Sequence, residues 1–317
     1  MQGLAQILSL VLANTVLPAA PLVESGVQVS ETEAVSGEPE IVGGEEDRYD
    51  RMTLPVHIGE HGPFRFLLDT GSQSTVLSTA LADKLALPPG QSRTIVSIAG
   101  TQEVRTAEVE RILLGKRSYY GLEAPLLERG HIGADGILGI DSLQNQRVLV
   151  DFSDNFIAIN DTEKIAADRD FDIVVKARRR AGQLIMTNAD IDGKRARVII
   201  DTGSDVTIGN RALQRALARR GKIVETVLHS ATGQQLPAQM GFAERLSFGD
   251  ISITNVAIAF ADAAPFKKLA LDKRPALMLG MRELRVFKRI AIDFSRRKVM
   301  FDLPAEFEFE KPSGFAF

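Results

Sequence analysis

The feature that most constrains the fold of this chain is an internal repeat, in which a set of short motifs occurs twice in the same order. An apolar triplet is followed by Asp69-Thr70-Gly71-Ser72 in the first half, and by Asp201-Thr202-Gly203-Ser204 132 residues later. Duplication of a whole lobe predicts a pseudo-two-fold axis, on which residues at equal positions of the two halves can meet. Two more motif pairs keep this order: turns at Ala99-Gly100 and Thr232-Gly233, then apolar triplets ending in glycine at Ile137-Leu138-Gly139 and Met278-Leu279-Gly280.

The segments between these motifs predict a mainly β protein. Helical patterns are confined to residues 79–87 and 211–220, which follow the N-cap residues Ser78 and Asn210, with short turns after Gly139 and Gly280. We therefore expect an all-β, bilobal fold of two β-barrel-like lobes with few short helices. The strand candidates are short, rich in β-branched residues and alternating, at residues 53–58, 64–68, 104–114, 147–152, 173–175, 195–200 and 251–260.

Composition excludes several other classes of protein. A chain of 317 residues with 44% hydrophobic and 25% charged residues is long enough for two globular lobes. The absence of cysteine excludes disulfides, a thiolate nucleophile and cysteine-ligated metals. After the first twenty residues no apolar run is long enough to span a membrane. Residues 51–317 hold 37 basic and 32 acidic residues. This small positive charge is compatible with a weak preference for acidic substrates, and it predicts no nucleic-acid partner.

The first fifty residues differ from the rest of the chain. Residues 4–17 are apolar and small residues follow them, so we expect a signal peptide over 1–20 and a periplasmic or secreted protein. No Lys or Arg precedes the apolar run, which keeps open a cytoplasmic location with an uncleaved amphipathic helix or a misplaced start codon. The other expected segments are a mobile acidic spacer (21–47), an N-terminal lobe (48–160), a connector (161–170), a C-terminal lobe (171–304) and a tail (305–317).

The two Asp-Thr-Gly turns carry the chemistry that the repeat predicts. Gly71 and Gly203 permit a sharp turn, which holds each carboxylate at the end of a buried strand. If the turns meet on the axis, Asp69 and Asp201 cannot both ionise, and the pair holds one proton over a wide pH range. One carboxylate is then a base and the other an acid, which is what a metal-free attack of water on an amide requires.

These motifs resemble those of the retropepsin-like aspartic proteases in a duplicated, single-chain form, over roughly residues 50–304. The resemblance implies that Asp69 and Asp201 are catalytic and that Thr70 and Thr202 interlock the two loops. It implies that the apolar triplets ending at Gly139 and Gly280 support the loops from behind. The turns at Ala99-Gly100 and Thr232-Gly233 match the tips of two flaps, and neither candidate flap carries the tyrosine of the single pepsin flap.

The resemblance further implies an endopeptidase that holds an extended peptide, with a water between the aspartates as nucleophile. It implies no cofactor and no metal, and activity without dimerisation, since one chain holds both aspartates. Ser72 and Ser204 stand where retroviral enzymes usually have alanine. A hydroxyl that donates to the ionised carboxylate would lower the first pKa of the pair, so we expect an acidic to mildly acidic optimum.

Other interpretations compete with this one. Each Asp-Thr-Gly can be a simple turn, or the lobes can form an inactive peptide-binding module that keeps the fold. Glycoside hydrolysis also uses two carboxylates, but identical turns of duplicated lobes do not usually supply them. Asp151 and Asp293 match in the repeat and indicate structural turns. The histidines show no metal-ligand spacing and suit surface or strand positions: His57, His61, His131 and His229.

Overall fold

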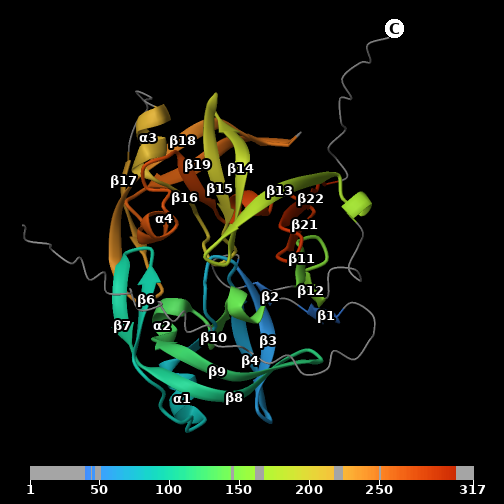
Figure 1. Ribbon diagram of the computed structural model, residues 1–317, viewed down its shortest axis with the longest axis vertical. Helices are drawn as coiled ribbons and strands as arrows, with labels where there is room; N and C mark the ends of the chain where they lie inside the picture. Colours follow the sequence, from blue (N-terminus) through green and yellow to red (C-terminus); the bar gives the residue numbers. More distant parts are fainter. Residues whose placement is uncertain are drawn as a thin grey trace, which may run out of the picture.

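The computed structural model describes residues 40–43, 45–46, 51–143, 146–160, 168–217, 224–249 and 251–304. The described chain is mainly β and forms two lobes stacked along the long axis of the molecule (Figure 1). The N-terminal lobe, in blue and green, lies below the C-terminal lobe, in yellow and red. The predicted fold class is confirmed. The predicted signal peptide and tail lie outside the described residues, as does most of the connector.

The N-terminal lobe is a closed barrel whose strands are neighbours in an order that mixes early and late segments. Pairing of the first strand with the last closes the barrel around Leu54, Phe66 and Ile112, whose side chains are fully buried. The six strands, in barrel order, are β3 (Met52–Ile58), β4 (His61–Leu68), β10 (Gly136–Leu138), β5 (Val76–Ser78), β9 (Arg117–Leu127) and β8 (Thr106–Leu114).

The C-terminal lobe repeats this order within a 13-stranded sheet. Pairing of β14 with β18 closes its ring, as pairing of β3 with β8 closes the first. The repeat seen in the sequence is therefore a repeat of topology. The equivalent strands are β14 (Gln183–Ile191), β15 (Lys194–Ile200), β20 (Ala276–Leu279), β16 (Thr207–Gly209), β19 (Ile251–Phe260) and β18 (Gln235–Phe248).

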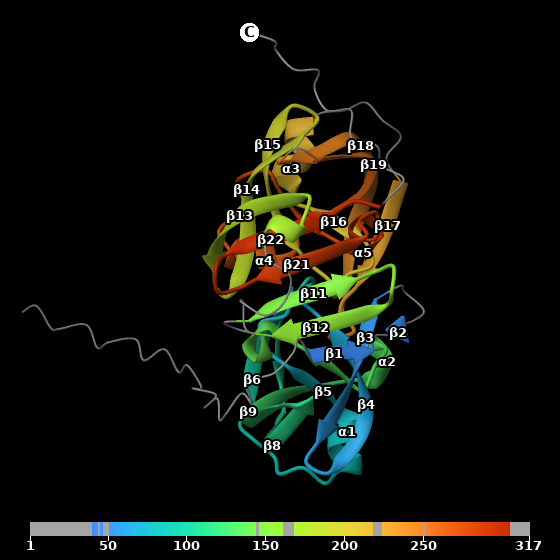
Figure 2. The ribbon, with the colours of Figure 1, turned by 90° about the vertical axis from the view of Figure 1, so that its right-hand side faces the viewer.

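A sheet shared by both lobes joins them (Figure 2). At its centre β11 (Arg147–Asp151) pairs antiparallel with β21 (Arg289–Asp293), with Leu149 opposite Ala291. Each of these strands has its own partner on the outer side, β12 (Phe156–Asn160) and β22 (Lys298–Asp302). Both central strands bury apolar side chains, so separating the lobes would expose a continuous part of the core.

Strands β1 (Glu40–Gly43) and β2 (Glu45–Glu46) correct the predicted boundary of the N-terminal lobe. They pair with β12 and β3, although we predicted an acidic spacer up to residue 47. In the second lobe a single strand, β13 (Ile173–Arg180), takes the place of both strands. Its first half pairs with β22, and its second half pairs with β14. The composition was misleading because an edge strand is held by backbone hydrogen bonds, which do not require apolar side chains.

The two capped helices begin where they were predicted. Ser78 accepts a hydrogen bond from the Leu81 amide at α1 (Thr79–Lys84), and Asn210 accepts one from the Leu213 amide at α3 (Arg211–Leu217). The first ends three residues early, because Ala86 adopts a φ of 50°. No described helix is long and apolar enough to cross a membrane. The other helical turns are α2 (Arg129–Ile132), η1 (Ile140–Ser142), η2 (Asp168–Asp170), α4 (Ala264–Lys268) and α5 (Met281–Leu284).

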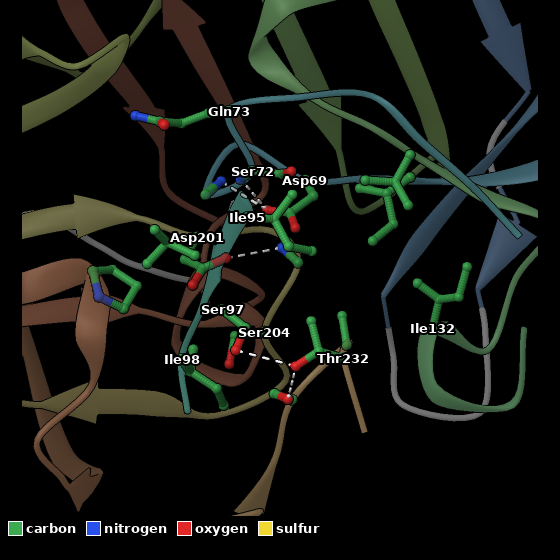
Figure 3. Close-up of a pocket in the computed structure, with 18 of the residues that line it drawn as sticks. Asp69, Ser72, Gln73, Ile95, Ser97, Ile98, Ile132, Asp201, Ser204 and Thr232 are labelled. Atoms are coloured by element: carbon green, nitrogen blue, oxygen red, sulfur yellow. Dashed lines mark hydrogen bonds between the residues drawn. The ribbon is translucent and has the colours of Figure 1, made fainter. Parts of the chain in front are cut away.

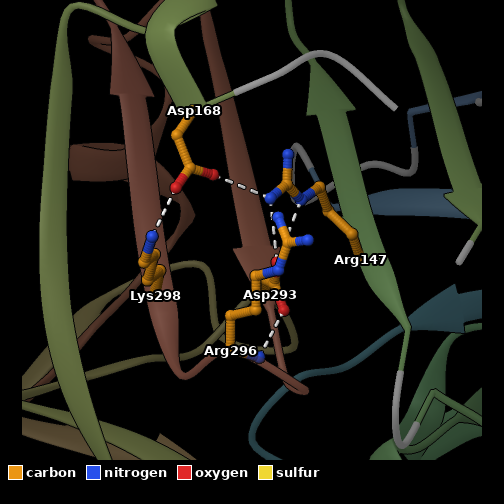
Figure 4. A network of polar contacts seen from close by, with 5 residues as sticks. All are labelled: Arg147, Asp168, Asp293, Arg296 and Lys298. Carbon is orange, nitrogen blue, oxygen red and sulfur yellow. Dashed lines mark hydrogen bonds and ion pairs between the residues drawn. The ribbon is translucent and has the colours of Figure 1, made fainter. Parts of the chain in front are cut away.

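An ion-pair network lies across the shared sheet (Figure 4). Arg147 on β11 donates to Asp293 on β21 at 2.9 Å, and both side chains are fully buried. Arg147 also donates to Asp168 at 2.8 Å, and Lys298 pairs with the same carboxylate. Hydrogen bonding to Lys298 holds the pKa of Asp168 below its ordinary value. Asp293 therefore joins the lobes, and it also accepts the Arg296 amide in the turn that we predicted from the sequence.

We expect Arg147→Met to lower the free energy of unfolding by about 3–5 kcal/mol, because it leaves the Asp293 carboxylate buried without its cation. Urea unfolding followed by circular dichroism measures this loss. The control is Lys288→Met, which changes an exposed cation close to the same sheet. Adding Asp293→Leu to Arg147→Met should recover part of the loss. An equal stability of the two single variants would contradict the role of the ion pair.

Candidate active site

Parallel strand pairs position the two Asp-Thr-Gly turns. β10 lies beside β4, and the Asp69 amide donates to the Leu138 carbonyl at 3.1 Å. In the second lobe β20 lies beside β15, and the Asp201 amide donates to the Leu279 carbonyl at 3.0 Å. The apolar triplets thus contact the backbone of both turns from behind. A side chain at Gly139 or Gly280 would overlap the backbone of the active-site loops at Ser74 and Val206.

A second layer of hydrogen bonds, which the sequence analysis missed, lies under each loop. Thr75 accepts the Gly139 amide at 3.1 Å and donates to Asp141 at 2.7 Å. In the other lobe the corresponding threonine is Thr207, which accepts the Gly280 amide and donates to Glu283. Burial raises the pKa of both acids. The sequence did contain a signal for these two acids, because each stands shortly after a supporting glycine in an otherwise apolar segment.

Thr70 and Thr202 connect the two turns across the pseudo-two-fold axis. The Thr70 hydroxyl donates to the Ile200 carbonyl at 2.9 Å, and the Thr202 hydroxyl donates to the Leu68 carbonyl at 2.8 Å. Each backbone amide also donates to the opposite hydroxyl, at 3.0 Å from Thr70 and 3.3 Å from Thr202. Both side chains are buried. Each loop is therefore fixed to the strand end of the opposite lobe.

The carboxylates of Asp69 and Asp201 line one and the same cavity (Figure 3). Both border Gly71, where a methyl group would lie 2.6 Å from Asp201 Oδ1 and 3.1 Å from Asp69 Oδ1. A methyl group at Gly203 would likewise overlap the Asp69 carboxylate. The glycines are therefore required because the carboxylates occupy the space that a side chain would fill.

The two carboxylates differ in environment. Asp69 accepts the Gly71 amide at 2.7 Å and the Ser72 amide at 2.9 Å, whereas Asp201 accepts the Gly203 amide at the longer distance of 3.2 Å, and the Ser204 amide also acts to lower its pKa. Burial, and then repulsion by Asp69, raises the pKa of Asp201 to about 8. Burial also raises the pKa of Asp69, and its two amide donors oppose that rise. Asp69 is thus the better stabilised carboxylate, and Asp201 is the better holder of a proton.

The serines that follow the glycines do not act as predicted. The Ser72 hydroxyl donates to the Ser74 carbonyl, and the Ser204 hydroxyl donates to the Val206 carbonyl, each at 2.8 Å. A hydroxyl has one proton to donate, so neither serine donates to Asp69 or Asp201 as we expected. The backbone amide of Ser72 reaches Asp69 instead.

Both predicted flaps are β-hairpins, and each tip contacts the opposite lobe. The first is β6 (Arg93–Ser97) with β7 (Gly100–Val104), where the Ile98 carbonyl accepts the Ala264 amide at 3.1 Å. The second is β17 (Val224–His229) with the start of β18, and its Ala231 packs on the N-terminal core. The tips meet where Thr232 donates to Ser97 at 3.2 Å. Ala99-Gly100 and Thr232-Gly233 therefore lie at the tips of hairpins, as predicted.

A cavity of about 310 Å³ lies between the aspartates and the hairpin tips. Arg51 and Gln183, which precede their aspartates by eighteen residues each, both line it, so the repeat held a signal for these positions. His131 and His229, which we predicted as surface or strand residues, also line the cavity. No group of three histidine or acidic side chains among the described residues is placed to hold a metal ion.

Comparison with known families agrees with this geometry. A family model described as "Aspartyl protease" matches the chain twice, over residues 54–142 and 187–282. Each match contains one Asp-Thr-Gly turn, one flap turn and one supporting triplet. Together the two matches cover more than half of the chain. No curated protein matches it.

We expect Thr70→Val to lower the free energy of unfolding by about 1–3 kcal/mol, since it leaves the Ile200 carbonyl without its buried donor. Thr70→Ser keeps the hydroxyl and should lose less. Thr101→Val, at an exposed position on β7, serves as control in the same urea titration. The role of the threonine hydrogen bonds would be refuted if the valine and serine variants at position 70 were equally stable.

Proposed function

The chain belongs to the aspartyl protease family, and from this premise we propose that it is an aspartic endopeptidase, with a water activated between Asp69 and Asp201 as nucleophile. The observation that supports this function is the pairing of two carboxylates from matching turns, beside a cavity that two hairpins border. Because both turns belong to one chain, the proposed activity does not require a dimer.

The unequal environments of the carboxylates suggest a division of roles. Asp69, with its two amide donors, is the base that removes a proton from the water as oxygen attacks the peptide carbonyl carbon. Asp201, whose pKa is raised to about 8, is the acid that protonates the carbonyl oxygen. The product of this step is a neutral tetrahedral diol. No covalent bond to the protein forms.

The hairpins supply the binding side of the proposal. An extended peptide would lie between the aspartates and the two hairpin tips, which have to separate for it to enter, since Thr232 and Ser97 now join them. Closure over the peptide would exclude water and strengthen the electrostatic effect of the pair. The apolar start of the chain supports export, so we propose an envelope or secreted protein as substrate.

We expect Asp69→Asn and Asp201→Asn each to lower kcat/KM by about a thousandfold or more, because each removes one partner of the proton exchange. A peptide-library digest of the full chain between pH 4 and pH 7, with products identified by mass spectrometry, measures this loss. Asp83→Asn, at an exposed position on α1, is the matched control. Cleavage by both active-site variants would refute the mechanism. A wild-type chain that binds a statine peptide without cleaving any substrate would instead indicate a peptide-binding module.

The pH dependence follows from the raised pKa of Asp201. We expect kcat/KM to fall as the pH rises through about 8, because Asp201 then loses the proton that it donates. This limit extends the active range beyond the mildly acidic optimum that we predicted from the serines. A profile measured with one peptide from pH 3 to pH 10 tests it, and full activity at pH 10 would contradict it.

Stability provides an independent measurement of the same shift. In the folded state Asp201 holds its proton up to a pH of about 8, whereas an unfolded aspartate loses its proton near pH 4. The folded state thus binds more protons between these values, and its stability should fall as the pH rises through that window. In Asp201→Asn this fall should be smaller. Identical slopes in both proteins would show that the pKa of Asp201 is not raised.

A further inference from the structure

One cation of the active-site cavity has no part in the proposed chemistry. Lys268 is the last residue of α4, on the C-terminal lobe, and it lines the cavity. Its ammonium group donates to the side-chain oxygen of Gln73, which belongs to the active-site loop of the N-terminal lobe. Gln73 lies four residues after Asp69, at the edge of the site, with its amide group turned away from that carboxylate (Figure 3).

The orientation of Gln73 is fixed by a second hydrogen bond. Its amide nitrogen donates to the Ala181 carbonyl at 2.7 Å, so its oxygen has to face Lys268. The ammonium group is therefore held at the cavity by a group from the opposite lobe. A cation on a flexible side chain is better suited to recognition when it is held in this way, because less freedom is lost on binding.

Lys268 has no anionic partner among the residues that the structure describes. Its partner is the neutral side-chain amide of Gln73. Partial burial of the ammonium group lowers its pKa, and no nearby acid opposes that effect. The side chain is nevertheless exposed and lines the cavity, so its charge is accessible to an anionic group of a bound peptide.

The internal repeat shows that this arrangement is particular to one side of the cavity. The residue that matches Gln73 in the second lobe is Asp205, four residues after Asp201, and it lines the same cavity. One end of the cavity thus presents an amide beside a cation, whereas the other presents a carboxylate. The pseudo-symmetric site is therefore polarised, and a peptide with an acidic residue has a reason to bind in one direction.

We propose that Lys268, positioned by Gln73, forms a subsite that selects substrates with an acidic side chain, at a position displaced from the scissile bond toward the Gln73 side. This inference rests on the proposed function, because it assigns the substrate class of the same cavity. Replacing the neutral amide contact of Lys268 by contact with a carboxylate gives a charge-assisted pair. At an exposed site such a pair favours glutamate over glutamine by about two- to fivefold in kcat/KM.

The test compares peptides that carry glutamate, glutamine or lysine at one position and are otherwise identical. Both ends of these peptides are blocked, so that any difference in cleavage rate comes from the varied side chain. A second set with a free carboxyl end tests whether a terminal carboxylate is preferred instead. The proteins are the full chain, Lys268→Met, Lys268→Glu and the control Lys267→Met. Lys267 is the preceding residue on α4 and, like Lys268, is exposed, but it does not line the cavity.

We expect the wild type and Lys267→Met to prefer glutamate at one position, and this preference to weaken as salt is added. Lys268→Met should lose the preference, and Lys268→Glu should prefer lysine at the same position. Cleavage by the wild type with no preference for glutamate would overturn the subsite and leave the proposed function intact. Two other outcomes would also overturn the subsite: a preference for glutamate that Lys268→Met retains, and a preference for a terminal carboxylate with none for a glutamate side chain.

A binding measurement separates this proposal from the proposed function. Glutamate and glutamine versions of a peptide with a reduced, uncleavable bond are titrated calorimetrically against the same four proteins. If the wild type cleaves nothing but binds the glutamate version about two- to fivefold more tightly, and Lys268→Met does not, the subsite stands although the proposed endopeptidase activity fails. Equal affinities for the two versions would overturn the subsite whether or not cleavage occurs.

Discussion

The hydrogen bonds that Thr70 and Thr202 exchange across the pseudo-two-fold axis are the contact on which the rest of the site depends. Each hydroxyl donates to a strand-end carbonyl of the opposite lobe and accepts the opposite amide, so neither loop can move without breaking buried hydrogen bonds in both lobes. This connection holds Asp69 and Asp201 against the same glycine, Gly71. The carboxylates repel each other, so a rigid connection beneath them is needed to keep them together.

The shared sheet supplies the same constraint at the level of whole lobes, and there the contacts are not symmetric. β11 and β21 both begin with arginine and end with aspartate, and their antiparallel pairing places each arginine opposite the other strand's aspartate. Arg147 and Asp293 form a fully buried ion pair. Arg289 instead pairs with Asp302 on its own lobe, and Asp151 accepts the Ser153 amide. Duplication thus gives both lobes one fold, while individual side chains acquire different partners.

The same loss of symmetry matters for function at the cavity. The amide hydrogen bonds of Asp69 are 2.7 and 2.9 Å long, whereas that of Asp201 to Gly203 is 3.2 Å, and this difference supports the proposed separation of an acid from a base in an otherwise repeated pair. Gln73 and Asp205, which also match in the repeat, give the two ends of the cavity different charge. A peptide has a direction, so a site that is nearly two-fold symmetric needs differences of this kind to bind it in one orientation.

The sequence by itself determined the duplicated fold, the two Asp-Thr-Gly turns, the supporting triplets, the capped helix starts and the places of the flap turns, because each depends on local pattern and on the repeat. The tertiary structure decided what depends on distance in space. It turned the Ser72 hydroxyl toward Ser74, placed Glu40–Gly43 in the shared sheet, and brought Lys268 to Gln73 from 195 residues away. Partners this far apart leave no periodic signal, since packing of the two lobes alone brings them together.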